Sequence, residues 1–348
     1  MPDLERPQFD QVLMLSSLPP PQGGNAVHAE RLTLALGDLG IEVDNWQPVE
    51  LKRVVKKTPW RLPNLLARYH GGRRPPGREI FHVHASALAQ YAAISRPMRW
   101  YTRQMARVIT IHSGSFLKAA TARTHRVVGI LRDFHVVICV NEAQRDWLLT
   151  QGFEPERVCV APAFLRPKPV QAALPEGWLP RRTDRRRLIT SGSMTPIYDY
   201  GVLLDTLRLT SPEQVEIVLA IYNEGDDAYE AEIIPQLARH DNVTIYRDQS
   251  ADVFQAMLAD SDVYVRTSTT DGDAVAVREA LSHGLAVVAT DCVVRPSACV
   301  LFSTSDGQDL HRRLCGALPS PEVSPGDENL QVILNAYSLA AELVKRDS

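Results

Sequence analysis

The stretch that decides the fold class is DVYVRTSTTDGDAVAVREALSHGLAVVATD, residues 262–291. Its apolar run Val263–Arg266 predicts a buried parallel strand, and a polar turn follows it. Ala274–His283 is amphipathic and predicts a helix, which Gly284 ends. A second buried strand, Leu285–Thr290, comes after the glycine. Strand, helix and strand in this order indicate an α/β protein.

The same alternation extends along the rest of the chain. Further strands are predicted at Val12–Ser16, Ile80–His84, Val108–His112, Val136–Val140, Val158–Ala161, Leu188–Thr190, Val215–Ile221 and Val243–Tyr246. Further helices are predicted at Ala26–Leu39, which Gly40 ends, and at Gly201–Leu207, Glu230–Arg239, Ala251–Leu258 and Leu330–Val344. The pattern predicts two α/β halves, each a doubly wound parallel sheet.

The chain divides where this periodicity stops. A length of 348 residues favours two domains, and Pro162–Arg187 is rich in Pro and Arg, as linkers are. We predict a Rossmann-like N-terminal domain over 1–165 and a linker over 166–187. A Rossmann-like C-terminal domain over 188–328 and a closing helix over 329–348, which crosses back to the first domain, complete the chain. Ligands bind beyond the C-terminal ends of such strands, so the cleft between the domains is the expected site.

Composition excludes several classes of protein. Hydrophobic residues make up 45% and charged residues 23%, which is typical of a globular protein and not of a disordered one. No stretch approaches the ~20 apolar residues of a membrane helix. The five cysteines lack CxxC spacing, which indicates neither a disulfide framework nor a zinc site. The first ten residues lack the apolar core of a secretory signal. We therefore expect a cytoplasmic protein.

Charge is distributed unevenly along the chain. Residues 1–170 hold 23 Lys and Arg against 14 Asp and Glu, and the remainder holds 15 against 27. The segment Lys52–Arg132 contains 17 basic residues and one acid, Glu79. Such a segment indicates either an anionic partner, such as a membrane surface, or a solvated arginine-rich face. Nucleic acid is not expected, because no known binding module accompanies the charge.

Asp271 and Glu279 are the acids most suited to a site. Glu279 comes eight positions after Asp271, which puts both on roughly one helix face about 12 Å apart at ~1.5 Å per residue. Glycosidase carboxyl pairs are about 5–9.5 Å apart, so that chemistry is not indicated. The spacing suits two contacts to separate parts of one long ligand.

In the first half, Gly23-Gly24 follows a strand and leads into a helix, where backbone amides can approach an anion. A plain turn is the alternative. His28, one turn into that helix, either faces a ligand or is packed.

His112 closes a strand, where it either contacts a sugar or phosphate oxygen or is satisfied by a neighbouring loop. His82 and His84 alternate on another strand. They lack carboxylate or cysteine partners at ligand spacing and are not interpreted as metal ligands.

The 262–291 block resembles the signature of family 4 retaining glycosyltransferases of the GT-B fold, in which an acid, seven residues and a Glu precede an Ala-(x)₃-Gly element and an apolar strand. Other parts follow the family's order: Gly23-Gly24, Thr110–Gly114, Ala161–Phe164, Ser191–Ser193, Tyr200–Val202 and the closing helix near Tyr337. The resemblance spans nearly the whole chain. It implies two Rossmann-like domains that face one another across a cleft.

The resemblance also implies a role for each matching residue. Glu279 would bind the ribose of a nucleotide-sugar, and Asp271 would lie near the donor sugar. His112 would contact that sugar. The catalytic residues expected on this basis are Asp271 and His112, and the donor-binding residues are Glu279, Arg266, Gly23, Gly24, Gly192, Gly272, Ala274 and Val275. No metal or cofactor is required.

The sequence departs from the family at three positions. Asp271 stands where Glu is usual. Ser193 and Tyr200 stand where the family commonly has Arg and Lys, so the departing nucleoside diphosphate lacks its usual cations. Because electrostatic stabilisation is among the largest catalytic effects, another cation must replace them or activity is lost.

Arg266 is the best replacement, since it lies at the C-terminal end of its strand and a guanidinium can chelate phosphate. Arg278 and Arg295 come next. The alternative for Arg266 is a salt bridge to Asp262 or Asp291 that only braces the loop.

We therefore expect a metal-independent glycosyltransferase that moves a sugar from a nucleotide-sugar to a glycan or lipid-linked acceptor with retention, at the inner face of a membrane. A non-catalytic GT-B accessory or binding protein is the alternative, which Ser193 and Tyr200 favour. A sugar-nucleotide epimerase of the same architecture is a further alternative. The basic first half does not favour it, because an epimerase needs no basic surface to bind an acceptor. Asp271-Gly272-Asp273 also resembles the metal-binding DxD motif of glycosyltransferases with the GT-A fold. The two Rossmann-like halves indicate the GT-B fold instead.

Overall fold

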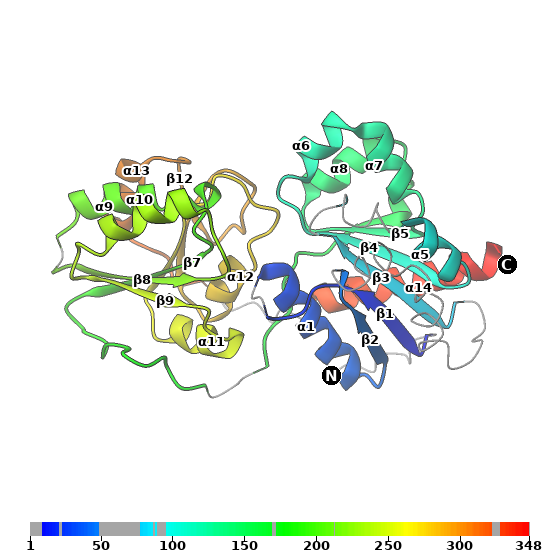
Figure 1. The fold of residues 1–348 in the computed structure, drawn as a ribbon, viewed down its shortest axis with the longest axis horizontal. Helices are drawn as coiled ribbons and strands as arrows, with labels where there is room; N and C mark the ends of the chain where they lie inside the picture. Colours follow the sequence, from blue (N-terminus) through cyan, green and yellow to red (C-terminus); the bar gives the residue numbers. More distant parts are fainter. Residues whose placement is uncertain are drawn as a thin grey trace. The chain divides into compact units, whose positions relative to one another are not determined.

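A computed structural model of the chain describes residues 9–20, 23–48, 77–85, 88, 95–168, 172–211, 213–321 and 328–347. The chain forms two compact units (Figure 1). The first comprises Met1–Pro19, His28–Leu165 and Asp327–Ser348, and the second comprises Pro20–Val27 and Arg166–Gly326. Each unit has one six-stranded parallel sheet between helices, which confirms the predicted α/β class with two doubly wound sheets.

The sheet of the first unit has the order β2-β1-β3-β4-β5-β6, with all pairs parallel. Because the order reverses between β1 and β3, these strands form its topological switch point. Alternate residues of β1 enter the cores on opposite faces, which explains its continuous apolar run. The strands are β1 (Gln11–Leu15), β2 (Glu42–Trp46), β3 (Glu79–Ala85), β4 (Ala106–Ile111), β5 (Val136–Cys139) and β6 (Val158–Val160).

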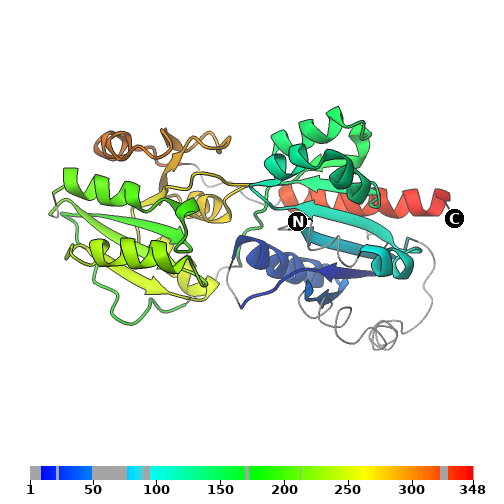
Figure 2. The same ribbon diagram turned by 45° about the horizontal axis from the view of Figure 1, so that its top comes forward.

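Helices cover both faces of this sheet. One face carries α1 (Gly24–Asp38) and α14 (Glu328–Asp347), and the other carries α5 (Ser95–Tyr101), α6 (Phe116–Ala122), α7 (Thr124–Leu131) and α8 (Glu142–Thr150). Helix α14 comes from the end of the described chain and packs along β3, β4, β5 and β6, as the red helix in Figure 2 shows. Gly40 follows α1 with φ +74°, a left-handed conformation that suits the predicted glycine stop.

The sheet of the second unit has the order β12-β11-β10-β7-β8-β9, and its switch point lies between β7 and β10. Its strands are β7 (Arg186–Gly192), β8 (Val215–Ile221), β9 (Val243–Arg247), β10 (Val263–Arg266), β11 (Ala286–Thr290) and β12 (Val300–Phe302). One face packs against α9 (Gly201–Leu209), α10 (Asp227–Leu237) and α13 (Gly307–Cys315), and the other against α11 (Ala251–Ala259) and α12 (Val275–Ser282). Two short 3₁₀ turns, η2 (Pro155–Arg157) and η3 (Pro196–Tyr198), complete the elements.

The structure differs from the expected domain limits at two places. Strand β7 begins at Arg186, so the last two residues of the expected linker 166–187 belong to the sheet. Arg187 can enter the sheet because its buried guanidinium pairs with Glu216 at 3.2 Å and Asp260 at 2.5 Å. Residues Pro20–Val27 were expected to belong to the 1–165 domain, but they group with the second unit.

The basic segment predicted to meet an anionic surface is only partly described. Residues 52–76, which include most of the basic residues from Lys52 to Arg78, lie outside the described residues. No helix among the described residues has both the length and the apolar character that crossing a bilayer requires.

Candidate functional site

Polar side chains of the second unit gather at the switch point, where β7 and β10 end. The two strands pair in parallel, so their C-terminal ends meet at one edge of the sheet. Arg266 is the last residue of β10, and its Nη1 donates to the carbonyl oxygen of Ser191 in β7 at 3.1 Å. The structure therefore places the predicted Arg266 at the ligand-binding edge of its sheet.

Asp271 joins two guanidinium groups at this edge. Arg266 donates to it through Nε at 3.0 Å and Nη2 at 2.8 Å, a bidentate pair, and Arg295 donates through Nη1 at 2.9 Å. The Ser268 hydroxyl donates to the same carboxylate at 2.7 Å. The three charged side chains are at most 10% exposed. Two guanidinium groups and one carboxylate give this arginine clamp (Arg266, Asp271, Arg295) one excess positive charge.

The clamp is strongly coupled electrostatically. Burial alone would raise the pKa of Asp271, but the charges of Arg266 and Arg295 and the hydrogen bonds from Arg266 and Ser268 lower it to about 2. The carboxylate is therefore ionised at neutral pH and fixes both guanidinium groups. Asp262 and Asp291, the partners considered for Arg266 from sequence, are engaged elsewhere, with Arg181 and Thr304 respectively.

Tyr198 supports the clamp from η3. The Arg266 guanidinium carbon lies 4.8 Å from the centre of the Tyr198 ring, in cation–π range. Gly192 is required for this packing, because a Cβ at its position would overlap the ring. Tyr200, where the resembled family has a Lys, is fully buried in the core, and its hydroxyl has no hydrogen-bond partner. Burial raises the pKa of Tyr200 well above 10.

Helix α12 begins directly after the Asp271 turn. Ala274 is its N-cap and makes no side-chain capping bond, so the amides of the first turn, from Val275 onwards, are free of a capping side chain. Such amides favour an anion. Gly272 is buried in the turn, and Asp273 accepts from Arg278 Nε at 2.8 Å.

Glu279 is held on the buried face of α12. Gln255 of α11 donates to its Oε1 at 2.8 Å, and the Gln255 carbonyl contacts His283 Nε2 at 2.9 Å. Tyr222, after β8, has a buried hydroxyl that finds no hydrogen-bond partner among the described residues. Burial, together with the negative charge of Glu279, raises the pKa of Tyr222. A polar ligand bound at Glu279 could thus also form a hydrogen bond with the nearby Tyr222 hydroxyl.

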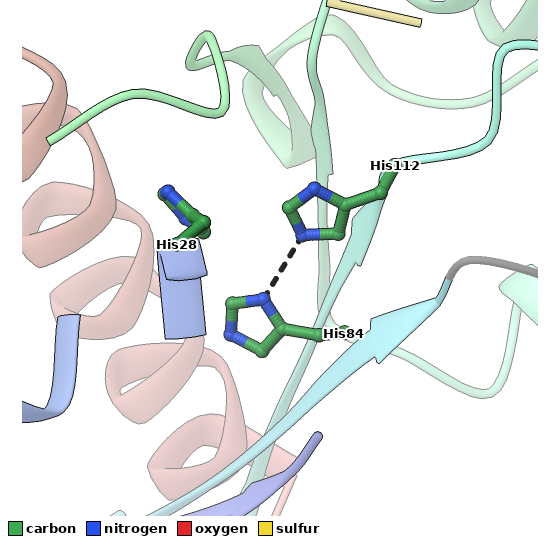
Figure 3. Close-up of side chains that lie close together, drawn as sticks. All are labelled: His28, His84 and His112. Atoms are coloured by element: carbon green, nitrogen blue, oxygen red, sulfur yellow. Dashed lines mark hydrogen bonds between the residues drawn. The ribbon is translucent and has the colours of Figure 1, made fainter. Parts of the chain in front are cut away.

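A separate polar cluster lies at strand ends of the first unit. Its members are His28 of α1, His84 of β3 and His112, which follows β4 (Figure 3). The three ring centres are 5.2–5.5 Å apart, and His84 Nδ1 lies 3.0 Å from His112 Nε2. Within the described part of the chain, His28 Nδ1 and His84 Nε2 are buried and have no hydrogen-bond partner. Beside them, His82 contacts Tyr337 Oη at 2.7 Å and Thr110 Oγ1 at 2.8 Å.

Three imidazoles can hold zinc, and one nitrogen from each histidine lies within 4.8 Å of the others. The contact between His84 and His112 does not have the geometry that two zinc ligands would have. Bonds of about 1.33 Å place each ring atom about 1.1 Å from the ring centre. Ring centres 5.2 Å apart and nitrogens 3.0 Å apart therefore put both nitrogens almost on the line between the centres. Each nitrogen points at the other, whereas zinc at about 2.0–2.1 Å from both would lie well off that line. The arrangement fits an N–H···N hydrogen bond.

Burial keeps this cluster neutral. It lowers the pKa of His28 to about 4, with a smaller contribution from Arg31, and that of His82 to about 3. The pKa values of His84 and His112 fall well below 6.5 for the same reason and through the neighbouring histidines. All four imidazoles are therefore uncharged at neutral pH.

The structure divides the predicted site residues between two places. At the ends of β7 and β10, and in the turn and helix α12 that follow β10, it places Gly192, Arg266, Asp271, Gly272, Ala274, Val275 and Glu279, while His112 lies in the histidine cluster of the first unit. Gly23 and Gly24 are exposed at the start of α1. We did not predict from the sequence the supporting residues Tyr198, Tyr222, Gln255 and Ser268 or the contact that His84 makes with His112. Only Ser268 carried a local signal, since it lies between Arg266 and Asp271 in the turn.

Comparison with known proteins gives a family match for the second unit and a fold likeness for the chain. Residues 185–318 match the family model described as glycosyl transferases group 1. No curated protein matches the chain. Among solved structures, HepE of Anabaena with UDP and glucose has a TM-score of 0.62 at 14% identity, over 97% of this chain and 95% of its own. Sucrose-phosphate synthase of Thermosynechococcus elongatus has a TM-score of 0.64 at 17% identity, over 97% and 98%.

The matched family covers the sheet that carries the clamp, and the structural likeness covers nearly the whole chain. The predicted GT-B fold is thereby confirmed. Residues 185–318 of the second unit thus match group 1 glycosyl transferases, and the chain has the GT-B fold.

Proposed function

We propose that the protein transfers a sugar from a nucleotide-sugar to a glycan or lipid-linked acceptor, with retention of configuration and without a metal or cofactor. The observation that carries this proposal is the arginine clamp at the switch point of a group 1 glycosyltransferase domain. Solved structures of HepE hold UDP or UDP-glucose, which supports a nucleotide-sugar donor here.

The clamp supplies the cations that the sequence lacks at Ser193 and Tyr200. A nucleoside diphosphate departs with at least two negative charges, and Tyr200 is packed in the core. Arg266 and Arg295 are held in place before any ligand binds, because Asp271 fixes both. Fixed donors are more effective than mobile ones, since they need no reorganisation as charge develops.

The other predicted residues contact other parts of the donor in this proposal. Glu279 binds the ribose, the first-turn amides at Ala274 and Val275 bind phosphate or sugar, and His112 donates a hydrogen bond to the sugar. Asp271 acts on the phosphates through the arginines that it holds.

The basic residues of the first unit suit an acceptor that is presented on an anionic surface. From residue 95 to residue 132 the chain has eight Lys and Arg and no acid. Trp100, 67% exposed on α5, lies under the guanidinium of Arg103 at 5.2 Å. Basic residues contribute about 1 kcal/mol each near anionic lipids. We therefore place the protein in the cytoplasm, peripheral to the inner face of the membrane.

Arg266→Ala and Arg295→Ala test the clamp. Each should weaken UDP binding about tenfold to hundredfold, because a hydrogen bond to a charged group contributes about 1.5–3 kcal/mol. Arg266→Ala should also lower the transfer rate about 10²-fold. Titration calorimetry with UDP and turnover with UDP-sugars measure both effects. Arg182→Ala is the control, since this exposed arginine of the same unit pairs with Asp184.

Equal UDP affinity in the wild type and both clamp variants would contradict the phosphate assignment. A second function, a non-catalytic sugar-nucleotide binding protein, is favoured by one observation: Arg266 and Arg295 are already engaged by Asp271. UDP binding that depends on the clamp, with no turnover of any nucleotide-sugar, would select that function.

A further inference from the structure

His84 makes one directed contact, to His112. The two residues lie at the ends of β3 and β4, which are adjacent parallel strands paired from Ile80 with Ala106 to Ala85 with Ile111. His84 faces the same side of the sheet as Thr110, its partner in register. His84 Nδ1 and His112 Nε2 are 3.0 Å apart and nearly collinear with the two ring centres, as the dashed line in Figure 3 shows. One of these nitrogens therefore donates a proton to the other.

The remaining nitrogen of His84 decides which one donates. His84 is 4% exposed, and its Nε2 is buried with no hydrogen-bond partner among the residues that the structure describes. If His112 donated, His84 would carry its own proton on Nε2, as an unpaired buried N–H group. Unpaired buried N–H groups are rare and cost about 1–3 kcal/mol. The proton of His84 therefore belongs on Nδ1, where it is hydrogen-bonded.

The tautomer of His112 follows from that of His84. A neutral imidazole has one donor and one acceptor nitrogen. Since His112 Nε2 accepts from His84, its proton is on Nδ1. His112 is half-buried, and its second nitrogen lies on the side of the ring away from His84 (Figure 3).

We infer that His84 is a positioning residue that holds His112 in the Nδ1–H tautomer and so makes it a hydrogen-bond donor to an acceptor oxygen of the substrate. The inference about the tautomer rests on the geometry alone, and the identification of the oxygen with a donor-sugar oxygen rests on the proposed function. In this state His112 cannot act as a general base through Nε2, because that lone pair is occupied. Its contribution is a neutral, fixed N–H group.

The tautomer can be read in the free protein. In ¹⁵N-histidine-labelled protein, two-bond ¹⁵N–¹H correlation spectra distinguish the tautomers, and the His112→Gln spectrum identifies the His112 signals among the ten histidines. We expect Nδ1–H at His112 in the wild type. His84→Asn retains an N–H donor near the Nδ1 position and should preserve it. His84→Leu has no donor, and His112 should then exchange between tautomers.

His82→Asn is the matched control. It removes another buried histidine from the same face of β3, whose contacts are to Tyr337 and Thr110 and not to His112. The His112 tautomer should be unchanged in this variant. If His84→Leu does not fold, the wild-type and His84→Asn spectra still decide the assignment.

Kinetics tests the positioning role. His84→Leu should lower kcat about tenfold, as expected for one neutral hydrogen bond of about 0.5–1.5 kcal/mol, and leave UDP affinity unchanged. His84→Asn should restore most of the loss. An Nε2–H tautomer in the wild type, an unchanged tautomer in His84→Leu, or one zinc per chain held by the three histidines in elemental analysis would overturn the inference. If no nucleotide-sugar is turned over, the proposed function fails, while the spectra still test the tautomer.

Discussion

Asp271 shows how a residue that matches a sequence motif can have partners in the structure that the motif does not indicate. The resemblance to family 4 glycosyltransferases implies that it lies near the donor sugar. In the structure both of its oxygens are engaged, by Arg266, Arg295 and Ser268. The spacing could predict where the acid lies but not its partners, because Arg295 is 24 residues away in sequence.

Asp271→Asn should destabilise the protein by at least about 2 kcal/mol at pH 7, since it leaves two buried guanidinium groups without their counter-ion. The wild-type contribution is complete above about pH 4 and disappears as the pH falls to about 2, because folding lowers the pKa from 3.8 to about 2. Denaturant unfolding at pH 7 and pH 3 measures this. Asp273→Asn is the control, with one arginine partner, Arg278; equal losses in both variants would refute the role of the clamp.

At the scale of elements, the apolar pattern predicted the central strands but missed helices α5 to α8 and α13 and two edge strands. Strands β2 and β12 were not predicted, and both lie at the edge of a sheet. An edge strand is covered less completely, so its sequence alternates or is short: β2 reads Glu-Val-Asp-Asn-Trp, and β12 has three residues. The candidate site residues at the ends of central strands could be predicted, because the apolar pattern shows where those strands end.

Gly192→Ala tests how the end of β7 supports the site. The added methyl group must displace the Tyr198 ring, which removes the cation–π support of Arg266. We expect a loss of about 1–3 kcal/mol in the free energy of unfolding and weaker UDP binding. The double variant Gly192→Ala/Tyr198→Ala should be less destabilised than the sum of its parts, because the ring is gone.

Gly129→Ala in α7 is the matched control, since its added methyl group meets no atom within 4 Å and alanine favours a helix. Strict additivity in the Gly192 and Tyr198 double-mutant cycle would rule out the proposed overlap.

At the scale of the whole molecule, the two units should respond differently to acid. In the first unit, folding lowers the pKa of His28, His82, His84 and His112, so these residues take up protons on unfolding. Stability therefore falls as the pH drops below 6.5, by up to about 1.4 kcal/mol per pH unit for each histidine. We expect the first unit to unfold at a higher pH than the second.

Circular dichroism melts and peptide-resolved hydrogen exchange between pH 7 and pH 4 would separate the two transitions. His28→Leu should make the pH dependence of the first unit shallower, whereas His125→Gln, at an exposed position of the same unit, should not change it. Loss of both units at one pH with the same slope would contradict the assignment.

The sequence predicted the division into two α/β halves, because the strand–helix rhythm stops and restarts around the linker. It could not predict the buried histidine cluster, whose members come from three separate elements and meet only when β3 and β4 pair and α1 packs on them. Nor could it predict that Pro20–Val27 groups with the second unit.

The return of α14 to the first unit has a consequence for biosynthesis. The second unit is a continuous stretch apart from Pro20–Val27, whereas the first unit needs segments from both sides of it. During translation, the sheet face that α14 covers, with Tyr337 beside His82, stays open until the second unit has left the ribosome. The later-synthesised unit can therefore complete its core before the earlier one, and the first unit is the one exposed to chaperones and aggregation in the interval.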